Sequence, residues 1–404
     1  MKKHLAEHLV VFIAAFCFLL SAGAANAVQS AAKKKHRAAN AAATCARAAD
    51  EEPFKAYIVM EATSGKVLEE QNSHERRAPA SMAKLMTACI VLEKVAGGEL
   101  HLTDKVPVSR KASKIGGSQV YLKEGESFTL EEMMRALMIA SANDAAYAIS
   151  ELIAGSSKGF VDLMNEKAKT LGMNDTEFAS VHGLPPSKDQ KEDVTSCYDM
   201  AVLAREVLKY PKILEWTSTK TGDFRNGTFI LNNHNKLLSR MPEVDGLKTG
   251  YYRSTGYNVA ATAKKGDIRF ITVVMGSPTA RARDNLAVEK LKKYFGEYTV
   301  INVARKGEQV DKAVVLDDGL YRTVKGVAAA DLSVTVMRSR KKDLKRMVNV
   351  PSSVKGEVKQ GQKIGEVVYE LDNAVVGKVD IVSPVFVPKA NIFTRMVRRA
   401  GLNI

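Results

Sequence analysis

Runs of β-prone residues stand at both ends of the first three quarters of the chain, and helical patterns fill the stretch between them. Residues 56–60 and 66–68 flank the turn residues 63–65, which is a hairpin signal. Residues 257–263 and 268–276 are joined by a short glycine-containing turn, so we expect them to pair antiparallel. A chain that returns to its opening sheet in this way is typical of an α+β fold, with one antiparallel sheet and a helical subdomain.

The helical stretch has one clear start and one clear interruption. Thr129 and Glu132 form the sequence pattern of a capping box and open an apolar-periodic segment. Ser141 and Asn143 then fall in a short group of residues that prefer caps and turns, after which 145–153 resumes a helical pattern. We therefore expect Ser141 and Asn143 on a bend between two helices. Further helices are predicted over 160–171, 196–208 and 283–295.

After residue 297 the pattern changes to short β-prone runs between turns that contain Gly, Lys and Asp, which predicts a small all-β domain. The chain is thus predicted to contain a signal peptide, an Ala/Lys-rich flexible linker, an α+β domain, a β-rich domain and a basic amphipathic helix. In that order, these segments are 1–27, 28–52, 53–297, 298–388 and 389–404.

The N-terminus has the three parts of a secretory signal peptide. Lys2 and Lys3 give a positive start, 9–20 is an apolar run, and 25–27 is a small-residue cleavage site. Because the apolar run is short for a transmembrane helix, we expect an exported chain that begins at Val28.

Three cysteines remain after removal of this segment: Cys45, Cys89 and Cys197. An odd number without a framework spacing does not predict a disulfide scaffold, although one disulfide stays open. Cys89 and Cys197 lie in helix-like apolar patterns, so we interpret both as buried free thiols.

The chain is strongly basic, with a formal net charge of +15 and a pI of about 9.4. Such a charge favours an anionic partner, which can be nucleic acid, anionic lipid or an acidic polymer such as cell wall. The sequence has no zinc-ligand spacing, P-loop or glycine-rich dinucleotide fingerprint, and only 6% of its residues are aromatic. We therefore favour a surface or a polymer and expect no nucleic acid, no metal and no cofactor.

The last stretch, 391–404, places apolar side chains on one helical face and Arg395, Arg398 and Arg399 on the other. A basic amphipathic helix of this kind can lie in an anionic membrane surface. A solvated tail is the alternative, but three arginines add electrostatic attraction. We expect peripheral attachment to an anionic membrane surface through this helix.

Ser81 and Lys84 stand at the start of an apolar run that predicts a helix. A serine hydroxyl is a weak nucleophile at neutral pH and needs a base to take its proton. Residues three apart in a helix share a face, so Lys84 can reach back over Ser81. Unpaired N–H groups at a helix start also suit an oxyanion. Alone, however, such a pair more often marks a helix start with an exposed lysine.

Two further motifs follow this pair along the chain. Together they form a known set of active-site motifs, S-x-x-K, S-x-N and K-T-G, in the expected order. The three motifs are Ser81-x-x-Lys84, Ser141-x-Asn143 and Lys248-Thr249-Gly250. With these motifs at a helix start, a bend and a strand, the chain resembles the serine penicillin-binding proteins, and most closely the low-molecular-mass D-alanyl-D-alanine carboxypeptidases. The likeness covers roughly residues 53–390. It implies a β-lactamase/transpeptidase-like catalytic domain followed by the β-rich domain and the terminal helix.

The resemblance implies a role for each residue of the first two motifs. Ser81 would attack the carbonyl carbon between two terminal D-alanines. Lys84 would be the base, provided that burial and the second cation Lys248 hold its pKa down. Ser141 would relay a proton to the leaving amine, and Asn143 would hydrogen-bond Lys84 and the acyl amide.

The third motif would bind the substrate. Lys248 would supply positive charge, and Thr249 a hydroxyl, for the substrate carboxylate. The backbone N–H groups of Ser81 and of Tyr251, which follows Gly250 on the strand edge, would form the oxyanion hole.

Four further residues have weaker assignments. Tyr252 stands where the family often has a threonine, so Arg283, where the resemblance also expects an arginine, is a second candidate for the carboxylate. Its alternative is a surface arginine at a helix start. We interpret His182, in a His-Gly-Leu loop, as a structural hydrogen-bonding residue, and His234 stays ambiguous in the same way.

The resemblance implies a D,D-carboxypeptidase that removes the terminal D-alanine from peptidoglycan stem pentapeptides and is acylated by β-lactams. A class A-like β-lactamase is disfavoured, because no Glu-x-x-x-Asn segment follows Ser141. The motifs also fit a D,D-endopeptidase of wall cross-links, although the tail domain favours the carboxypeptidase. A catalytically weak wall-binding scaffold stays open because of Tyr252.

Overall fold

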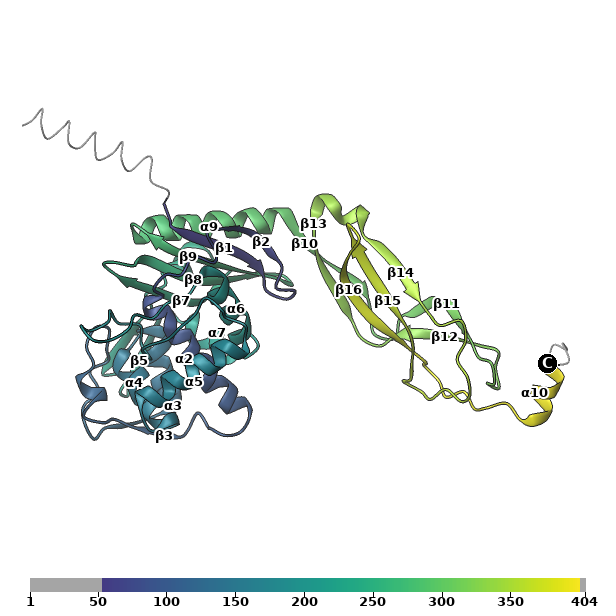
Figure 1. Cartoon of the computed structure of the whole chain (residues 1–404), viewed down its shortest axis with the longest axis horizontal. Helices are drawn as coiled ribbons and strands as arrows, with labels where there is room; N and C mark the ends of the chain where they lie inside the picture. The colour runs from purple at the N-terminus through teal and green to yellow at the C-terminus, as the bar shows by residue number, and fades with distance from the viewer. Residues whose placement is uncertain (1–52, 400–404) are drawn as a thin grey trace, which may run out of the picture. The chain divides into compact units, whose positions relative to one another are not determined.

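The structure is a computed structural model that describes residues 53–399 (Figure 1). The predicted signal peptide and linker lie outside the described residues, as do Cys45 and the last part of the predicted C-terminal helix. All elements described below belong to the compact unit that begins at Phe54.

Five antiparallel strands form the central sheet of the first domain, in the order β2-β1-β9-β8-β7 (Figure 1). They are β1 (Ala56–Glu61), β2 (Val67–Gln71), β7 (Val244–Tyr252), β8 (Gly256–Lys265) and β9 (Ile268–Ser277). Ile58 of β1 pairs with Val273 of β9, so the hairpin that opens the chain lies beside the later one. The predicted return of the chain to its opening sheet is confirmed.

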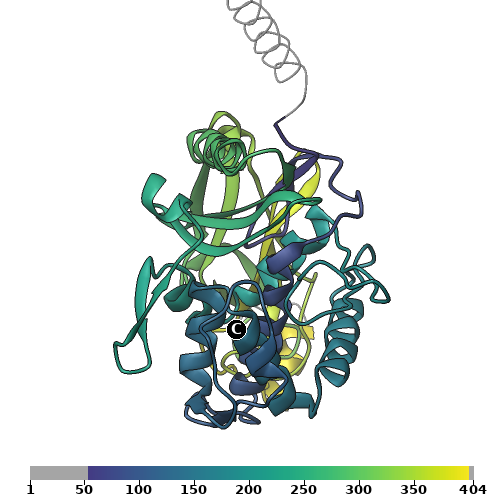
Figure 2. The same ribbon diagram turned by 90° about the vertical axis from the view of Figure 1, so that its left-hand side faces the viewer.

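Both faces of this sheet are buried, and each belongs to a separate apolar core. Ile58 and Met60 of β1 pack with the helical block, whereas Tyr57 and Val59 pack on the side of α9 (Ala280–Glu297). This alternation follows from the two-residue period of a strand. Figure 2 shows α9 on one side of the sheet and the helical block on the other.

The helical block lies between β2 and β7 in the chain. Its elements are η1 (Ala80–Ala83), α2 (Lys84–Ala96), η2 (Ala112–Lys114), α3 (Leu130–Ile139), α4 (Asn143–Ala154), α5 (Ser157–Thr170), α6 (Cys197–Val207), α7 (Lys212–Thr217) and α8 (Leu237–Arg240), with the short strand pairs β3 (Lys105–Pro107) and β4 (Ser127–Thr129), β5 (Thr221–Phe224) and β6 (Phe229–Asn232). Every residue of α2 from Lys84 to Leu92 is buried. A helix that is buried all round lies inside the domain, so α2 carries Lys84 into the interior.

The helix starts follow local capping chemistry. The predicted capping box is confirmed: Thr129 Oγ1 accepts from the Glu132 N–H, and the Glu132 carboxylate accepts from the Thr129 N–H. Helix α9 begins at Ala280 rather than at the predicted Arg283. The reason is Thr279, whose Oγ1 accepts from a first-turn N–H and caps the helix.

The two cysteines among the described residues are free and buried, Cys89 in α2 and Cys197 in α6. Burial raises the pKa of the Cys89 thiol to about 12, and it raises the pKa of the Cys197 thiol as well. Both thiols are therefore protonated at neutral pH, and the prediction of buried free thiols is confirmed.

The residues after α9 form the predicted all-β fold. Strand β10 (Tyr298–Ala304) pairs with β13 (Leu332–Met337), and five other strands form a sheet in the order β11-β12-β16-β15-β14. The remaining elements are β11 (Gln309–Val315), β12 (Thr323–Ala328), η3 (Arg338–Asp343), β14 (Lys345–Asn349), β15 (Lys363–Leu371) and β16 (Ala374–Val382). Gly326 in β12 and Gly377 in β16 interrupt the apolar patterns of these two strands.

The last described element is α10 (Ile392–Arg399). Its apolar side chains Ile392, Phe393 and Met396 are exposed. Within residues 53–399, no helix combines the length and the apolarity that crossing a membrane requires.

Candidate active site

Ser81 and Lys84 are brought into contact where η1 passes into α2. Lys84 Nζ lies 2.9 Å from Ser81 Oγ and donates a hydrogen bond of 2.6 Å to the backbone carbonyl of His182. Ser81 is half-buried, whereas Lys84 is fully buried. The serine thus remains reachable from outside while the amine that faces it is shielded from water.

The backbone of residues 78–82, which we call the serine turn, is tightly enclosed. Ala80 has a positive φ of 49°, and two glycines pack against this turn. A Cβ at Gly183 would stand 2.0 Å from the Ala80 carbonyl oxygen, and a Cβ at Gly250 would stand 2.4 Å from that of Pro79. No side chain fits at either position. The glycine of K-T-G is therefore required by the close approach of β7 to the serine turn.

Ser141 and Asn143 lie where α3 passes into α4, on the predicted bend. Ser141 has a φ of 61°, and Asn143 is the first residue of α4. Asn143 Nδ2 donates to the Gly116 carbonyl at 2.7 Å. Ser141 Oγ and Asn143 Oδ1 are buried and have no hydrogen-bond partner among the described residues. Such atoms are uncommon in proteins, and both oxygens remain available to a ligand. The predicted hydrogen bond between Asn143 and Lys84 is not formed, because the Lys84 amine contacts Ser81 Oγ and the His182 carbonyl instead.

Lys248, Thr249 and Gly250 lie on β7, the edge strand of the sheet. Lys248 is only 3% exposed, and its Nζ donates to the Thr249 carbonyl at 3.0 Å. Within residues 53–399 no carboxylate pairs with this amine. Burial, and then the charge of Arg283, lowers the pKa of Lys248 to about 7.

The surroundings of Lys84 favour its neutral form. Burial, and then the charge of Lys248, holds the pKa of Lys84 well below its usual range. The carboxylates of Asp144 and Asp193 act in the opposite direction but do not outweigh the loss of hydration. A neutral amine can accept the proton of Ser81 Oγ, which is the task of a general base.

A cavity of about 440 Å³ opens beside Ser81. Its wall joins one residue of each motif, Ser81, Ser141 and Thr249, with Tyr251 and Arg283. The size lies within the range of small-ligand pockets. The cavity therefore offers a nucleophile, further hydroxyl groups and a guanidinium to one ligand.

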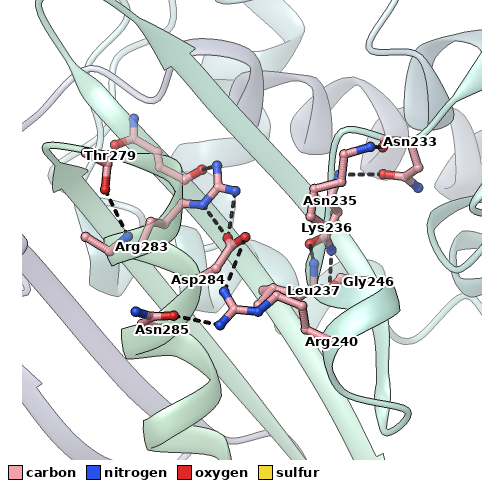
Figure 3. A network of polar contacts seen from close by, with 12 residues as sticks. Asn233, Asn235, Lys236, Leu237, Arg240, Gly246, Thr279, Arg283, Asp284 and Asn285 are labelled. Atoms are coloured by element: carbon pink, nitrogen blue, oxygen red, sulfur yellow. Dashed lines mark hydrogen bonds and ion pairs between the residues drawn. The ribbon is translucent and has the colours of Figure 1, made fainter.

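Arg283 is buried in this wall rather than exposed at a helix start. Its Nε and Nη2 donate to Asp284 Oδ1 at 2.9 and 2.7 Å (Figure 3), and its Nη1 donates to the Asn258 carbonyl at 3.3 Å. Figure 3 also shows Arg240 beside the same carboxylate, with Nη1 3.8 Å from Asp284 Oδ2. Two guanidinium groups thus share one carboxylate, and the alternative of a surface arginine is wrong.

The two tyrosines after K-T-G point in different directions. Tyr251 is 52% exposed, and its ring stacks on Tyr257 with the ring centroids 4.1 Å apart. Tyr252 Oη instead donates to Glu192 Oε1 at 2.6 Å. Tyr252 is not among the described residues that line the cavity, so its hydroxyl does not replace the threonine of the family pattern.

The two histidines near the site are neutral at physiological pH. Burial, and then the charge of Lys84, lowers the pKa of His182 to about 3, and its Nδ1 accepts from the Leu184 N–H at 3.2 Å. His234 lines the cavity, and burial followed by the charge of Lys248 lowers its pKa to about 4. Among the described residues, no group of three or more His, Cys, Asp or Glu is arranged to hold a metal ion.

Sequence reasoning missed two buried polar residues, Asn258 and Asp193. Asn258 Nδ2 donates to the Ala78 carbonyl at 3.1 Å, and its Oδ1 accepts from the Gly276 N–H at 2.8 Å, so it ties the serine turn to β9. The only sequence signal for Asn258 is a polar residue inside an apolar strand. Asp193 lies in a loop without any periodic pattern, and its contacts are described below.

The amino-acid sequence matches the family described as D-alanyl-D-alanine carboxypeptidase over residues 43–279, and the family described as Penicillin-binding protein 5, C-terminal domain over residues 298–389. It is 34% identical over 351 residues to the D-alanyl-D-alanine carboxypeptidase DacF of Bacillus subtilis (strain 168), a match that covers 86% of this chain and 89% of that protein. It is 31% identical over 352 residues to DacA of Escherichia coli (strain K12), with 85% and 86% covered.

Solved structures agree with these matches. Penicillin binding protein 5 from Haemophilus influenzae superposes with a TM-score of 0.70 at 27% identity, covering 84% of this chain and 98% of that one. Penicillin-Binding Protein D2 from Listeria monocytogenes, in its ampicillin-bound form, superposes with a TM-score of 0.54 at 32% identity, covering 60% and 97%. Sequence and structure therefore point to the same group of proteins.

Proposed function

Because this chain belongs to the D-alanyl-D-alanine carboxypeptidase family of serine hydrolases, we propose that it removes the terminal D-alanine from peptidoglycan stem peptides through an acyl-enzyme on Ser81. The observation that carries this proposal is the distance of 2.9 Å between Ser81 Oγ and the buried amine of Lys84. A serine in contact with a base of lowered pKa is an activated nucleophile.

Acylation uses the first two motifs. Neutral Lys84 takes the hydroxyl proton as Ser81 Oγ attacks the carbonyl carbon of the penultimate D-alanine. Ser141 Oγ, which is buried and has no partner in residues 53–399, passes the proton from Lys84 to the leaving nitrogen. The C–N bond then breaks, D-alanine departs, and an ester remains on Ser81. Asn143 Oδ1 accepts a hydrogen bond from the acyl amide.

The third motif holds the substrate during this step. Lys248, Thr249 and Arg283 bind the carboxylate of the terminal D-alanine. The backbone N–H groups of Ser81 and Tyr251 stabilise the negative oxygen of the tetrahedral intermediate. The close packing of Gly250 on the serine turn supports this pairing of the two N–H groups.

Hydrolysis of the ester completes the cycle. A water molecule, deprotonated by Lys84, attacks the ester carbonyl, and Ser81 Oγ recovers a proton as the peptide acid leaves. A β-lactam acylates Ser81 by the same attack, but its leaving nitrogen stays tethered to the acyl group, so the adduct persists. The ampicillin-bound form of the Listeria protein supports this part of the proposal.

The chain is proposed to work outside the cytoplasm, at the periplasmic face of the inner membrane. The sequence features in 1–27 support export, with 28–52 as a linker between the cleaved segment and the catalytic domain at 53–297. The boundary with the β-rich domain at 298–388 is supported by the end of α9 and the start of β10.

A surface of exposed apolar side chains supports attachment to a membrane. Leu320 N donates to the Pro388 carbonyl at 2.8 Å, so two loops of the β-rich domain adjoin each other near the start of α10. More than half of the large hydrophobic side chains that are exposed in residues 53–399 belong to these loops and to α10. They are Leu320, Tyr321, Val385, Phe386, Ile392, Phe393 and Met396.

Two arginines of α10 contact protein, where the sequence suggested lipid. Arg395 Nε lies 3.1 Å from Asp318 Oδ1, and the Arg398 guanidinium donates to the carbonyls of Gly319 and Leu320 at 2.7 and 2.8 Å. These contacts dock the basic side of α10 on a loop and leave its apolar side outward. We therefore propose that apolar insertion by helix and loops contributes more to membrane binding than charge does.

One incubation tests the enzymatic proposal. Purified protein is mixed with a pentapeptide ending in D-Ala-D-Ala, with a cross-linked wall fragment and with a fluorescent penicillin. Free D-alanine together with a persistent adduct on Ser81 is the expected result. An adduct without product favours the scaffold, cleavage of cross-links alone favours the endopeptidase, and rapid penicillin turnover favours a lactamase.

Vesicle sedimentation tests the membrane proposal. Phe386→Ser is expected to weaken binding to anionic vesicles by about tenfold, which corresponds to the lost burial of one large apolar side chain. Val375→Ser is the matched control, because Val375 and Phe386 are 58% and 54% exposed but Val375 lies on β16. Equal binding of the two variants contradicts a role for the loop.

A further inference from the structure

Asp193 is a buried carboxylate in the loop before α6, and it is only 4% exposed. Its Oδ1 accepts from the backbone N–H groups of Ala179 and Ser180 at 2.6 and 2.8 Å, and its Oδ2 accepts from Ser180 Oγ at 2.6 Å. All three partners are donors, which suits an ionised carboxylate, because that group only accepts. Burial raises the pKa of Asp193, and these hydrogen bonds act in the opposite direction. Asp193 therefore fixes the start of the turn that follows Ala179.

The same turn presents the carbonyl that contacts the catalytic amine. Ser180 Oγ accepts from the Gly183 N–H at 2.8 Å, which closes the turn. His182, inside the turn, accepts from Lys84 Nζ through its backbone carbonyl at 2.6 Å. Gly183, with a φ of 75°, packs directly on the backbone beside Ser81. A chain of hydrogen bonds and backbone links thus leads from the Asp193 carboxylate through Ser180 and His182 to Lys84.

The direction of this hydrogen bond matters for a neutral lysine. A neutral amine has two N–H groups and one lone pair. When one N–H is committed to the His182 carbonyl, the second N–H and the lone pair are left for the remaining neighbours, among which is Ser81 Oγ. A turn that loses its shape would leave the amine free to rotate, and small misplacements of reacting groups are costly.

The residue before Asp193 is anchored on the other side of the site. Glu192 Oε1 accepts from Tyr252 Oη at 2.6 Å, and Tyr252 follows K-T-G on β7. Neighbouring backbone is also held, because Val194 and Glu177 exchange two hydrogen bonds of 2.9 Å. The carboxylate of Asp193 is therefore placed by a loop that is tied to the substrate-binding strand.

We propose that Asp193 is a positioning residue of this enzyme: through Ser180 it fixes the turn whose His182 carbonyl orients Lys84 toward Ser81. It also places a negative charge near the amine. This inference rests on the proposed roles of Ser81 and Lys84, and it goes beyond them because Asp193 lies outside all three motifs.

The charge of Asp193 acts on Lys84 together with those of other groups. The ionisable groups that face Lys84 are Lys248 on β7, Asp144 on α4, His182 and Asp193 in the loop before α6, and His234 after β6. Asp144 and Asp193 are the two that favour the charged amine. Removing the charge of Asp193 therefore makes Lys84 lose its proton at a lower pH.

Three variants distinguish the effect of the turn on the position of Lys84 from the effect of the Asp193 charge. All are assayed by the rate constant of Ser81 acylation with a fluorescent penicillin. Saturation labelling first gives the active fraction of each preparation, so misfolded protein does not enter the rate. Asp193→Ala is expected to acylate about 10- to 100-fold more slowly per active site. Ser180→Ala, which keeps the charge, is expected to be slower without a change in pH dependence.

Asp193→Asn gives the sharpest readout, because its amide oxygen can still accept from the two backbone N–H groups. The acylation rate constant rises with pH as Lys84 loses its proton, and this rise is the acid limb of the profile. In Asp193→Asn the acid limb is expected at lower pH than in the wild type. Asp189→Asn, an exposed change in the same loop, is the control and is expected to keep the wild-type profile.

The inference is overturned if Asp193→Asn keeps the wild-type acid limb, or if Asp193→Ala and Ser180→Ala both acylate at the wild-type rate. Failure of the wild-type protein to form an adduct at Ser81 would instead contradict the proposed function itself. If the wild-type protein forms the adduct at Ser81 and the variants acylate as it does, only the role of Asp193 is contradicted.

Discussion

The catalytic and β-rich domains treat charged side chains in opposite ways. Among its described residues, the catalytic domain buries eight charged side chains: Glu61, Lys84, Asp144, Asp193, Asp199, Lys248, Arg283 and Asp284. Among the described residues of 298–388, Ser383 is the one residue classed as buried and polar. Lysines such as Lys341 and Lys345 are exposed. Both domains come from one basic chain, so composition does not explain the difference.

The difference shows where this protein tolerates the cost of desolvation. An unpaired cation in a protein interior is destabilising, and Lys248 has no carboxylate partner within the described residues. Such a cost is typical of functional sites, where a lowered pKa serves the chemistry. Apart from Ser383, the described residues that the β-rich domain buries are apolar, and its charged side chains stay in contact with water, as expected of a domain without its own reaction.

The largest expected effect is the loss of the nucleophile. Ser81→Ala is expected to reduce release of D-alanine by about 10⁴- to 10⁶-fold, since removal of a catalytic serine has effects of this order. It is also expected to abolish the covalent penicillin adduct. Mass spectrometry of penicillin-treated protein checks both the stoichiometry and the site, and an adduct on another residue would contradict the assignment.

Replacement of the buried base comes next. Lys84→Met keeps the bulk of the side chain but removes the proton acceptor, and it is expected to slow acylation by about 10³-fold. Lys265→Met, at the exposed last residue of β8, makes the same chemical change at the surface. Stopped-flow labelling should leave the Lys265 variant at the wild-type rate, and a similar loss in both variants would remove the contrast between buried and exposed lysines.

The two buried lysines predict opposite limbs of a pH profile. Activity should rise with pH as Lys84 loses its proton and becomes a base. It should fall above about pH 7 as Lys248, whose pKa is lowered to about 7, loses the charge that binds a carboxylate. Each limb has a slope of about tenfold per pH unit in kcat/KM for the pentapeptide.

An arginine variant sharpens this test. Lys248→Arg stays charged at all accessible pH values, so it should lose the alkaline limb while keeping an acid limb. Persistence of the alkaline limb in this variant would show that another group titrates there.

The smallest expected effect is on stability. Lys248→Met is expected to raise the free energy of unfolding at neutral pH by about 1–3 kcal/mol, because it removes a buried unpaired charge. Lys341→Met, on the surface of the β-rich domain, should change it by less than about 0.5 kcal/mol. Urea denaturation of the two variants measures both values.

The pH dependence of this gain follows from linkage. Lys248 binds a proton less tightly in the folded state, with its pKa lowered from 10.5 to about 7. The unfolded state therefore holds more protons between these values, and the stability of the wild type rises with pH across that window. The advantage of Lys248→Met should shrink over the same range, and a constant difference would contradict the lowered pKa.

Local signals predicted much of the fold and the central pair of the site. The capping box at Thr129, the hairpin around Gly266 and the spacing from Ser81 to Lys84 each depend on residues that are close in sequence. Such contacts follow from helix and turn periodicity. They are also the features that the structure reproduces most directly.

Long-range contacts escaped prediction because nothing local specifies them. Arg283 was open between a surface and a site position until its bonds to Asp284 placed it in the wall. Asp193 gave no signal, since a polar residue in a loop is usually solvated. The docking of Arg395 on Asp318 likewise joins two segments far apart in the chain.

Direct titration of Lys84 tests the central claim that a buried neutral amine activates Ser81. The protein is labelled with [ε-¹³C]lysine, and the Lys84 resonance is assigned by its absence from Lys84→Met. The prediction is a Lys84 resonance that titrates well below the usual range of a lysine, with a midpoint that coincides with the acid limb of Ser81 acylation. A Lys84 that remains charged across the whole range of activity would contradict its role as the base.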